Sequence, residues 1–167
     1  MRIWIDILSY LPFAIVLLYV AKDVFGKHPA VEHSTKFKAR RALNWVPLGL
    51  TYAFLYFGRY NINAATTALG KLTPNAAFGT IFGVGAAVYG CSFLINGPLT
   101  DRIGGRKTIL ISALGSAVFN ALLGALVYAV LALKFEPPGG LVLWMSVLYG
   151  ANMYFQSFGA VSIVKVN

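Results

Sequence analysis

The sequence predicts an all-α protein, a polytopic bundle of membrane helices. Hydrophobic residues make up 58% of the 167 residues, and charged residues only 11%, which is about half of the charged share of a typical soluble domain. Five apolar stretches are each long enough to cross a bilayer, which takes about 20 residues. Most of the charges and prolines fall between these stretches. Length, composition and spacing therefore agree on a membrane bundle.

The predicted membrane spans follow one another along the chain with short separators. They cover residues 3–25, 43–69, 76–95, 109–133 and 141–164. A basic linker at 30–41 separates the first two, and the turn Gly70-Lys71-Leu72-Thr73-Pro74 follows the second. The segment 134–140 contains Pro137-Pro138-Gly139-Gly140, a composition typical of a loop.

Small residues recur at helical spacing in two of the spans. The third span holds Gly79 and Gly83, followed by Ala86 and Gly90, each pair four residues apart. The fourth span repeats alanine at the same spacing, at Ala117, Ala121 and Ala125. Small side chains at this spacing let membrane helices approach closely. We expect helix contacts at these positions.

The distribution of cations predicts the orientation. A net charge of +9 would suggest a nucleic-acid partner in a soluble protein, but here the cations gather in the segments beside apolar spans, which is the pattern of basic cytoplasmic loops. If the spans alternate, one side holds Lys22, Lys27, Lys36, Lys38, Arg40, Arg41, Arg102, Arg106 and Lys107, and the other holds Arg2, Lys71 and Lys134. We expect an inner or plasma membrane protein with its N-terminus outside, the segment 97–108 in the cytoplasm, and no nucleic-acid partner.

The first span is either a retained helix or a cleaved signal peptide. It contains Asp6 and Pro12 and lacks a convincing small-residue cleavage site. Cleavage would leave the basic linker outside and invert every later span, against the charge rule. We therefore expect residues 1–35 to form an extra transmembrane helix and the start of the cytoplasmic linker, and residues 36–167 to form four core helices. The extra helix would serve targeting, lateral packing or a partner.

Other residue patterns argue against an enzyme or a metal centre. Cys91 is the only cysteine and lies inside a predicted span. His28 and His33 have only Glu32 near them, so a solvated linker is a better interpretation than a metal site. The spans hold no carboxylate pair and no nucleophile with a base. We expect no enzymatic activity, no metal and no cofactor.

The segment 97–108 carries the most specific motif. It holds Asp101-Arg102, the pair Gly104-Gly105 and then Arg106-Lys107, so it predicts a short charged loop that turns at the glycines. The segment resembles the signature G-x-L-x-D-R-x-G-R-[RK] of the major facilitator superfamily. This resemblance implies the facilitator fold, represented by its N-terminal helices, and secondary transport. It also implies a cytoplasmic gate formed by Gly97, Asp101, Arg102, Gly104 and Arg106, in which Gly97 permits close approach and Asp101 has a structural role.

Arg59 is the second feature with chemistry, because a guanidinium within a span costs a few kcal/mol unless it is paired or hydrated. Tyr52, Tyr56, Arg59 and Asn63 fall within an arc of about 60° on one helix face. Arginine presents a planar fork that suits a phosphate or a carboxylate and keeps its charge when buried. Two interpretations stay open: an anion site, or an arginine that extends to the outer headgroups beside belt tyrosines.

The surroundings of Arg59 resemble the first core helix of the organophosphate:phosphate antiporters. That resemblance implies that Arg59 binds a phosphoryl group with Tyr52, Tyr56 and Asn63 beside it, and that Tyr89 lines the same pocket. Phe155-Gln156-x-x-Gly159 and Lys165 are similar to a further family segment. Two departures stand out: Phe93 replaces a lysine of one branch of the family, and Ala160-Val161-Ser162 replaces Trp-Pro-Pro. A monoanion or a carboxylate such as a hexuronate then becomes a plausible substrate beside a phosphate ester.

The predicted function is transport of a small organic anion as part of a facilitator in the lipid bilayer. A complete facilitator has two six-helix halves, whereas four core helices are predicted here. The remaining helices of the transporter, or a larger membrane complex, are therefore expected partners. The alternative is a non-transporting accessory subunit that is derived from a truncated facilitator and packs in a larger complex.

Overall fold

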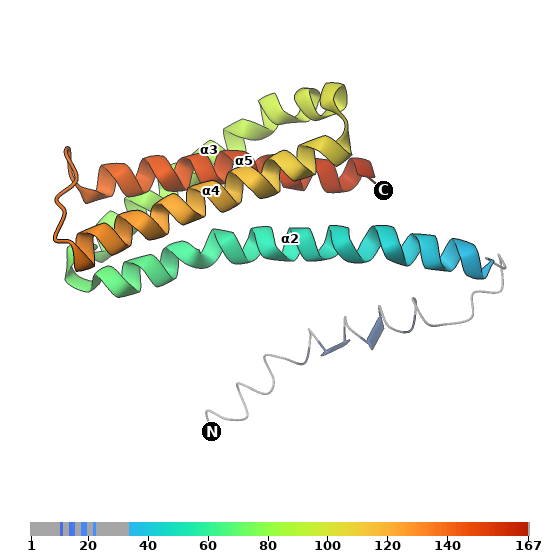
Figure 1. The fold of residues 1–167 in the computed structure, drawn as a ribbon, viewed down its shortest axis with the longest axis horizontal. Helices are drawn as coiled ribbons and strands as arrows, with labels where there is room; N and C mark the ends of the chain where they lie inside the picture. Colours follow the sequence, from blue (N-terminus) through green and yellow to red (C-terminus); the bar gives the residue numbers. More distant parts are fainter. Residues whose placement is uncertain (1–10, 12–13, 16–17, 20–21, 23–33, 167) are drawn as a thin grey trace. The chain divides into compact units, whose positions relative to one another are not determined.

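The protein is all-helical throughout the part of the chain that the computed structural model describes, which comprises residues 11, 14–15, 18–19, 22 and 34–166 (Figure 1). Its elements are α2 (Thr35–Leu69), the short helix η1 (Gly70–Leu72), α3 (Asn75–Ile103), α4 (Gly105–Ala132) and α5 (Leu141–Val166). The prediction of an all-α protein is confirmed for these residues. Apart from six isolated positions, the predicted span 3–25 lies outside them, as do His28 and His33.

The chain divides into two compact units, Met1–Ala42 and Leu43–Asn167. In the first unit, the described part is mainly the beginning of α2, where the Ser34 hydroxyl accepts a hydrogen bond of 3.3 Å from the Phe37 backbone N–H. This serine therefore caps the start of the helix. The second unit contains the rest of α2 and all the other elements, and it holds every candidate site residue.

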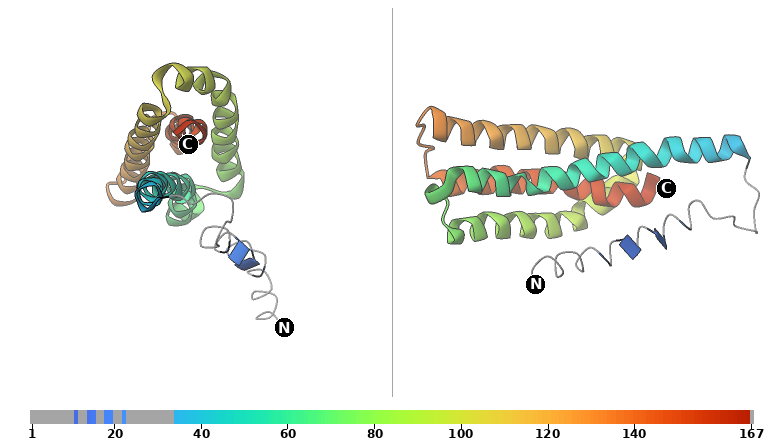
Figure 2. Two further views of the ribbon diagram at one scale, coloured as in Figure 1. Left: turned by 90° about the vertical axis from the view of Figure 1, so that its right-hand side faces the viewer. Right: turned by 90° about the horizontal axis from the view of Figure 1, so that it is seen from below.

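Within the second unit, α5 is the central helix. Seen end-on, it lies between α3 and α4, with the second-unit part of α2 on the remaining side (Figure 2). Apolar side chains from all four helices form one core cluster, made of Ile62, Leu69, Ile81, Leu123, Met145, Tyr149 and Met153. These side chains contact one another across the helices, and their van der Waals contacts hold the bundle together. Because α5 lies in the middle of this core, it contributes more buried residues than the outer helices.

Three glycines let α5 contact its neighbours closely. A methyl group added at Gly85 of α3 would overlap the ring of Tyr149, and one at Gly115 of α4 would overlap the ring of Phe155. One added at Gly159 of α5 would lie 2.5 Å from Leu55 Cδ1 of α2. Each helix that surrounds α5 thus has at least one close contact with it at a glycine.

The sequence predicted helix contacts at other glycines of α3. Within the described residues, nothing lies within 4 Å of a methyl group added at Gly79, Gly83 or Gly90, so the prediction of contacts there is wrong for this bundle. At 100° per residue, Gly83 and Gly90 lie about 160° and 140° around α3 from Gly85. They therefore face away from α5.

Two of the described helices, α3 and α4, are long and apolar enough to cross a membrane. By the same measure α2 and α5 do not reach the required hydropathy, although they have 35 and 26 residues. The reason is their polar side chains, which include Arg59 and Asn61 in α2 and Asn152 and Gln156 in α5. Composition therefore supports the predicted membrane spans in α3 and α4, and it does not support them in α2 and α5.

Two predicted separators are largely helical. The segment 97–108 is not an extended loop, because α3 continues to Ile103 and α4 begins at Gly105. The turn between them is confined to Gly104, whose φ of +92° favours glycine. The basic linker 30–41 is likewise shorter than expected, since α2 begins at Thr35. Charged residues at both places extend the helices instead of ending them.

Candidate functional site

Arg59 lies on α2 where that helix faces α3 and α5, and it is partly buried. Its Nε donates a hydrogen bond of 3.0 Å to Gln156 Oε1 of α5. Its guanidinium carbon lies 4.7 Å from the ring centroid of Tyr56 and 4.3 Å from that of Tyr89, which are distances typical of cation–π contacts. The guanidinium is therefore held by one amide and two aromatic rings.

None of these contacts carries a negative charge. The described residues contain an ion pair between Lys165 and Asp101 and none with Arg59. The two terminal nitrogens of Arg59 make no hydrogen bond to the described part of the chain. A partly buried cation with neutral partners is costly unless a counter-ion or water completes it. The cluster is therefore electrostatically suited to receive an anion.

The tyrosines predicted around Arg59 come together in the structure. The hydroxyl of Tyr52 donates to that of Tyr56 over 3.4 Å, and their rings meet edge-on with centroids 5.0 Å apart. Tyr89, from α3, packs edge-on against Phe93 with centroids 4.9 Å apart. Phe93 thus supplies an apolar ring beside Tyr89 and no second cation. The cluster formed by Tyr52, Tyr56, Arg59, Tyr89 and Gln156 is called the Arg59 cluster below.

Asn63 differs from the other residues of the predicted stripe. Its side chain is exposed and forms no hydrogen bond within the described residues, while its backbone carbonyl accepts from the hydroxyls of Thr66 and Thr67. It lies one helical turn beyond Arg59 and forms no hydrogen bond to the side chains that hold the guanidinium, which are all among the described residues. Its predicted role stays a prediction.

A chain of amides and hydroxyls fixes Gln156 from behind. The Gln156 amide donates to Ser116 Oγ at 3.3 Å and to Asn152 Oδ1 at 3.2 Å. Ser116 and Asn120 of α4 also donate to Asn152 Oδ1, at 2.6 and 3.1 Å. Asn61 of α2 donates to Asn120 Oδ1 at 3.3 Å. This polar network connects three helices and ends at Arg59.

The network was not predicted, although its spacing is visible in the sequence. Ser112, Ser116 and Asn120 recur every four residues in an apolar helix, and so do Asn152 and Gln156. Such spacing places polar side chains on one helix face. The Gln156 side chain is 2% exposed, which shows that this face points inward. Polar residues at four-residue spacing within apolar spans were the signal that could have found the network.

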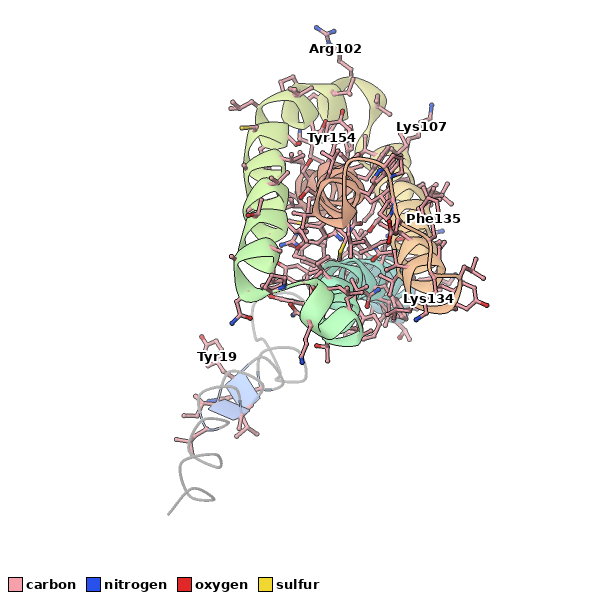
Figure 3. The ribbon with its side chains drawn as sticks, turned by 90° about the vertical axis from the view of Figure 1, so that its left-hand side faces the viewer. Tyr19, Arg102, Lys107, Lys134, Phe135 and Tyr154 are labelled. Carbon is pink, nitrogen blue, oxygen red and sulfur yellow. The ribbon has the colours of Figure 1, made fainter. Side chains whose placement is uncertain are left out.

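The residues predicted for a gate lie at or near the α3–α4 junction. Asp101 of α3 forms an ion pair with Lys165 near the end of α5. Arg102 and Arg106 are exposed, and Arg102 points away from the bundle, as does Lys107 (Figure 3). No described neighbour lies within 4 Å of a methyl group added at Gly97, so the expected close approach at Gly97 is not seen in this part of the chain.

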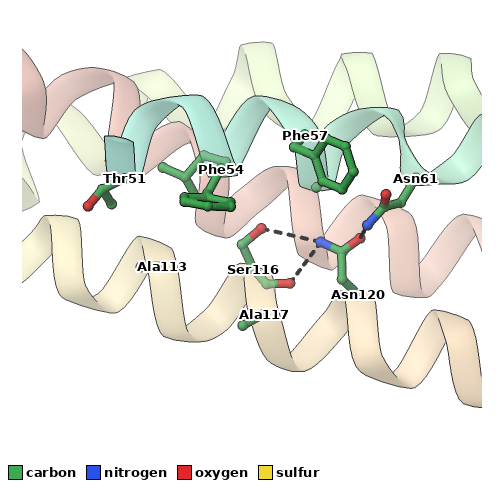
Figure 4. A pocket seen from close by; sticks show the side chains of 10 residues that line it. Thr51, Phe54, Phe57, Asn61, Ala113, Ser116, Ala117 and Asn120 are labelled. Atoms are coloured by element: carbon green, nitrogen blue, oxygen red, sulfur yellow. Dashed lines mark hydrogen bonds between the residues drawn. The ribbon is translucent and has the colours of Figure 1, made fainter. Parts of the chain in front are cut away.

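A groove of about 360 Å³ lies between α2 and α4 (Figure 4). Phe54 and Phe57 flank it, and Ser116, Asn120 and Asn61 form its polar part. These polar groups already bond to one another within the network. The groove therefore offers an apolar surface with its hydrogen-bonding groups largely occupied, unlike the Arg59 cluster.

Comparison with known proteins adds no identification. No family model matches the chain, and no curated protein or solved structure matches it either. Among the described residues, no three histidine, cysteine, aspartate or glutamate side chains gather as a metal site would require. The geometry of the Arg59 cluster and the motifs of the sequence are therefore the features that bear on function.

Proposed function

We propose that this chain takes part in the transport of a small organic anion across a membrane, as the N-terminal portion of a major facilitator. The observation that carries the proposal is the state of Arg59: a partly buried guanidinium whose described partners are all neutral and whose terminal nitrogens make no bond to the described chain.

The energetics of Arg59 support an anion as the missing partner. A cation at depth in a membrane protein costs a few kcal/mol or more, and an arriving anion would offset that cost through charge-assisted hydrogen bonds. The rings of Tyr56 and Tyr89 exclude water from part of the guanidinium without neutralising it.

The membrane setting is supported by α3 and α4, whose length and hydropathy suit a bilayer. The facilitator-like motif at 97–108 supports the assignment to a transporter, and a gate there is part of the proposal. Asp101 would hold α3 to α5 through Lys165 in one of the two access states of the transporter. Gly104 would fix the α3–α4 turn, with Arg102 and Arg106 exposed beside it.

A second candidate function is that of an accessory membrane subunit. The observation that favours it is the exposure of large apolar side chains on outer helix faces, such as Phe57 at 71% and Leu94 at 81%. Surfaces of this kind suit lipid or the helices of another protein. The two candidates differ in whether an anion crosses the membrane.

The test is uptake of radiolabelled anions by membrane vesicles from cells that express the chain together with the helices that complete the transporter. Phosphate, a hexose phosphate and a hexuronate form the panel, and the variants are Arg59→Lys and the matched exposed change Arg41→Lys. We expect uptake of at least one anion that Arg59→Lys reduces about ten- to a hundredfold, because a lysine cannot reproduce the planar fork, while Arg41→Lys has no effect. Uptake equal to that of vesicles without the chain would remove the transport proposal and favour the accessory subunit.

A further inference from the structure

We infer that the Arg59 cluster is built for an anion with a single negative charge and two coplanar oxygens, a carboxylate, and that Gln156 is the positioning residue that sets how Arg59 meets it. The inference rests on the proposed function and specifies the ligand of the same site.

The charge of the cluster favours a single negative charge on the ligand. Arg59 is its only charged member, since Tyr52, Tyr56, Tyr89 and Gln156 are neutral. Phe93 adds only a ring next to Tyr89. One guanidinium can neutralise one negative charge, and a second charge would remain uncompensated in a partly buried site, where unpaired charge is costly.

The geometry of Arg59 suits an anion that presents two oxygens side by side, as a carboxylate does, and the single charge of the cluster then favours a carboxylate over a doubly charged phosphate ester. The guanidinium has its donors in one plane, and its Nε is engaged by Gln156 Oε1 at 3.0 Å. This removes the edge that combines Nε with a terminal nitrogen. The edge formed by the two terminal nitrogens remains, and it presents two parallel N–H groups that match the two oxygens of a carboxylate.

The side-chain amide of Gln156 can adopt only one of its two orientations. Its NH₂ group faces two oxygens, Ser116 Oγ at 3.3 Å and Asn152 Oδ1 at 3.2 Å. A flipped amide would direct its NH₂ toward the N–H of Arg59 and its oxygen toward an acceptor, so the network excludes it. The carbonyl of Gln156 therefore always faces Arg59, and the same guanidinium edge is left for a ligand.

The experiment measures equilibrium binding of radiolabelled benzoate to the full chain in lipid nanodiscs at pH 5 and pH 8. The competitors are benzenesulfonate, which has one charge at both pH values, and phenyl phosphate, whose second ionisation near pH 6 takes it from one charge to two. We expect benzenesulfonate to compete equally at both pH values, and phenyl phosphate to compete about tenfold less well at pH 8 than at pH 5, which corresponds to 1.4 kcal/mol.

Two variants test Gln156 and keep the inference falsifiable if one of them fails to fold. Gln156→Leu removes the acceptor at similar volume and should weaken benzoate binding about tenfold, with the preference for a single charge retained. Gln156→Glu keeps an acceptor and adds a negative charge beside Arg59, so benzoate binding should be lost while the helical circular dichroism signal stays native. Native benzoate affinity in both variants would overturn the role of Gln156.

The outcomes separate this inference from the function on which it rests. Phenyl phosphate that competes equally well or better at pH 8 would overturn the single-charge inference and leave anion transport standing. Absence of binding by benzoate, benzenesulfonate and phenyl phosphate, together with no uptake of the anion panel, would overturn both.

Discussion

Arg59 and Arg102 both belong to motifs that the sequence singles out, and the structure surrounds them differently. Arg59 is partly buried and bonds only to neutral groups. Arg102 is exposed and points away from the bundle, next to Asp101, whose charge is already paired with Lys165. Charge that is unpaired and partly buried can be used by a ligand. Charge that is exposed or already paired can stabilise helix ends but contributes little to the binding of a ligand. The predictions below test this contrast between the Arg59 cluster and the α3–α4 junction.

The largest effect is expected from Arg59→Gln. This change removes the only charge of the Arg59 cluster, so anion binding should fall about a hundredfold or more, because hydrogen bonds to a charged group contribute about 1.5–3 kcal/mol each. Equilibrium binding of benzoate checks it. The matched control is Arg41→Gln, which removes an exposed charge from the first unit and should leave affinity unchanged. An equal loss in both variants would mean that net charge, and not the cluster, attracts the anion.

The next effect concerns the network behind Arg59. Asn152→Ala removes the oxygen that accepts hydrogen bonds from Ser116, Asn120 and Gln156. The buried donors left behind should lower the free energy of unfolding by about 1–3 kcal/mol. Thermal unfolding in detergent checks this, with Asn63→Ala as the control, since that exposed side chain should cost less than about 0.5 kcal/mol. Similar melting of both variants would show that the network contributes no stability.

A third effect concerns the contact that brings α3 against α5. Gly85→Ala would force a methyl group into the ring of Tyr149, and overpacking of this kind costs about 1–3 kcal/mol. The matched change Gly83→Ala meets nothing within 4 Å and should stabilise the helix by up to about 1 kcal/mol. Thermal unfolding midpoints that move in opposite directions confirm the orientation of α3. Midpoints that move together would contradict it.

The smallest effect on stability is expected at the junction. Asp101→Asn breaks the ion pair with Lys165, but the Asp101 side chain is 62% exposed, and exposed pairs contribute about 0–1 kcal/mol. We therefore expect almost native melting, with a lower maximal rate of anion uptake and an unchanged apparent affinity if Asp101 acts in a gate. Lys165→Met should behave in the same way. A loss of anion affinity in either variant would show that the α3–α4 junction takes part in anion binding, and would contradict the difference drawn between the two regions.

The sequence predicted the helical class, most helix boundaries and the position of Tyr56 beside Arg59 because those features depend on local patterns, whereas Tyr89 was expected only from the family resemblance. The turn at Gly104 and the helix ends at Leu69 and Ala132 follow from glycine, proline and polar residues nearby. The partners of Arg59 within its own helix follow from helical periodicity. These inferences need no knowledge of which helices become neighbours.

The features that the sequence did not predict depend on tertiary contacts. Whether Gly83 or Gly85 faces α5 cannot be read from spacing alone, because α3 is apolar on most of its circumference. The continuation of α3 past Pro98 to Ile103, and the pairing of Asp101 with Lys165 of α5, were likewise not visible in local sequence patterns. The role of Gln156 follows from the central position of α5, because only there does the Gln156 amide bond to both Arg59 and Asn152.

The most direct test of the central claim is nuclear magnetic resonance of the chain in nanodiscs with ¹⁵N-labelled arginine. The chain contains six arginines, and the account predicts that benzoate shifts the guanidinium signals of one of them, which is absent in Arg59→Lys. The Nε signal, which reports the bond to Gln156, should shift less than the signals of the two terminal nitrogens. A shift at Arg102 or Arg106 instead, or no shift in any arginine at saturating benzoate, would contradict the claim that Arg59 is an anion site.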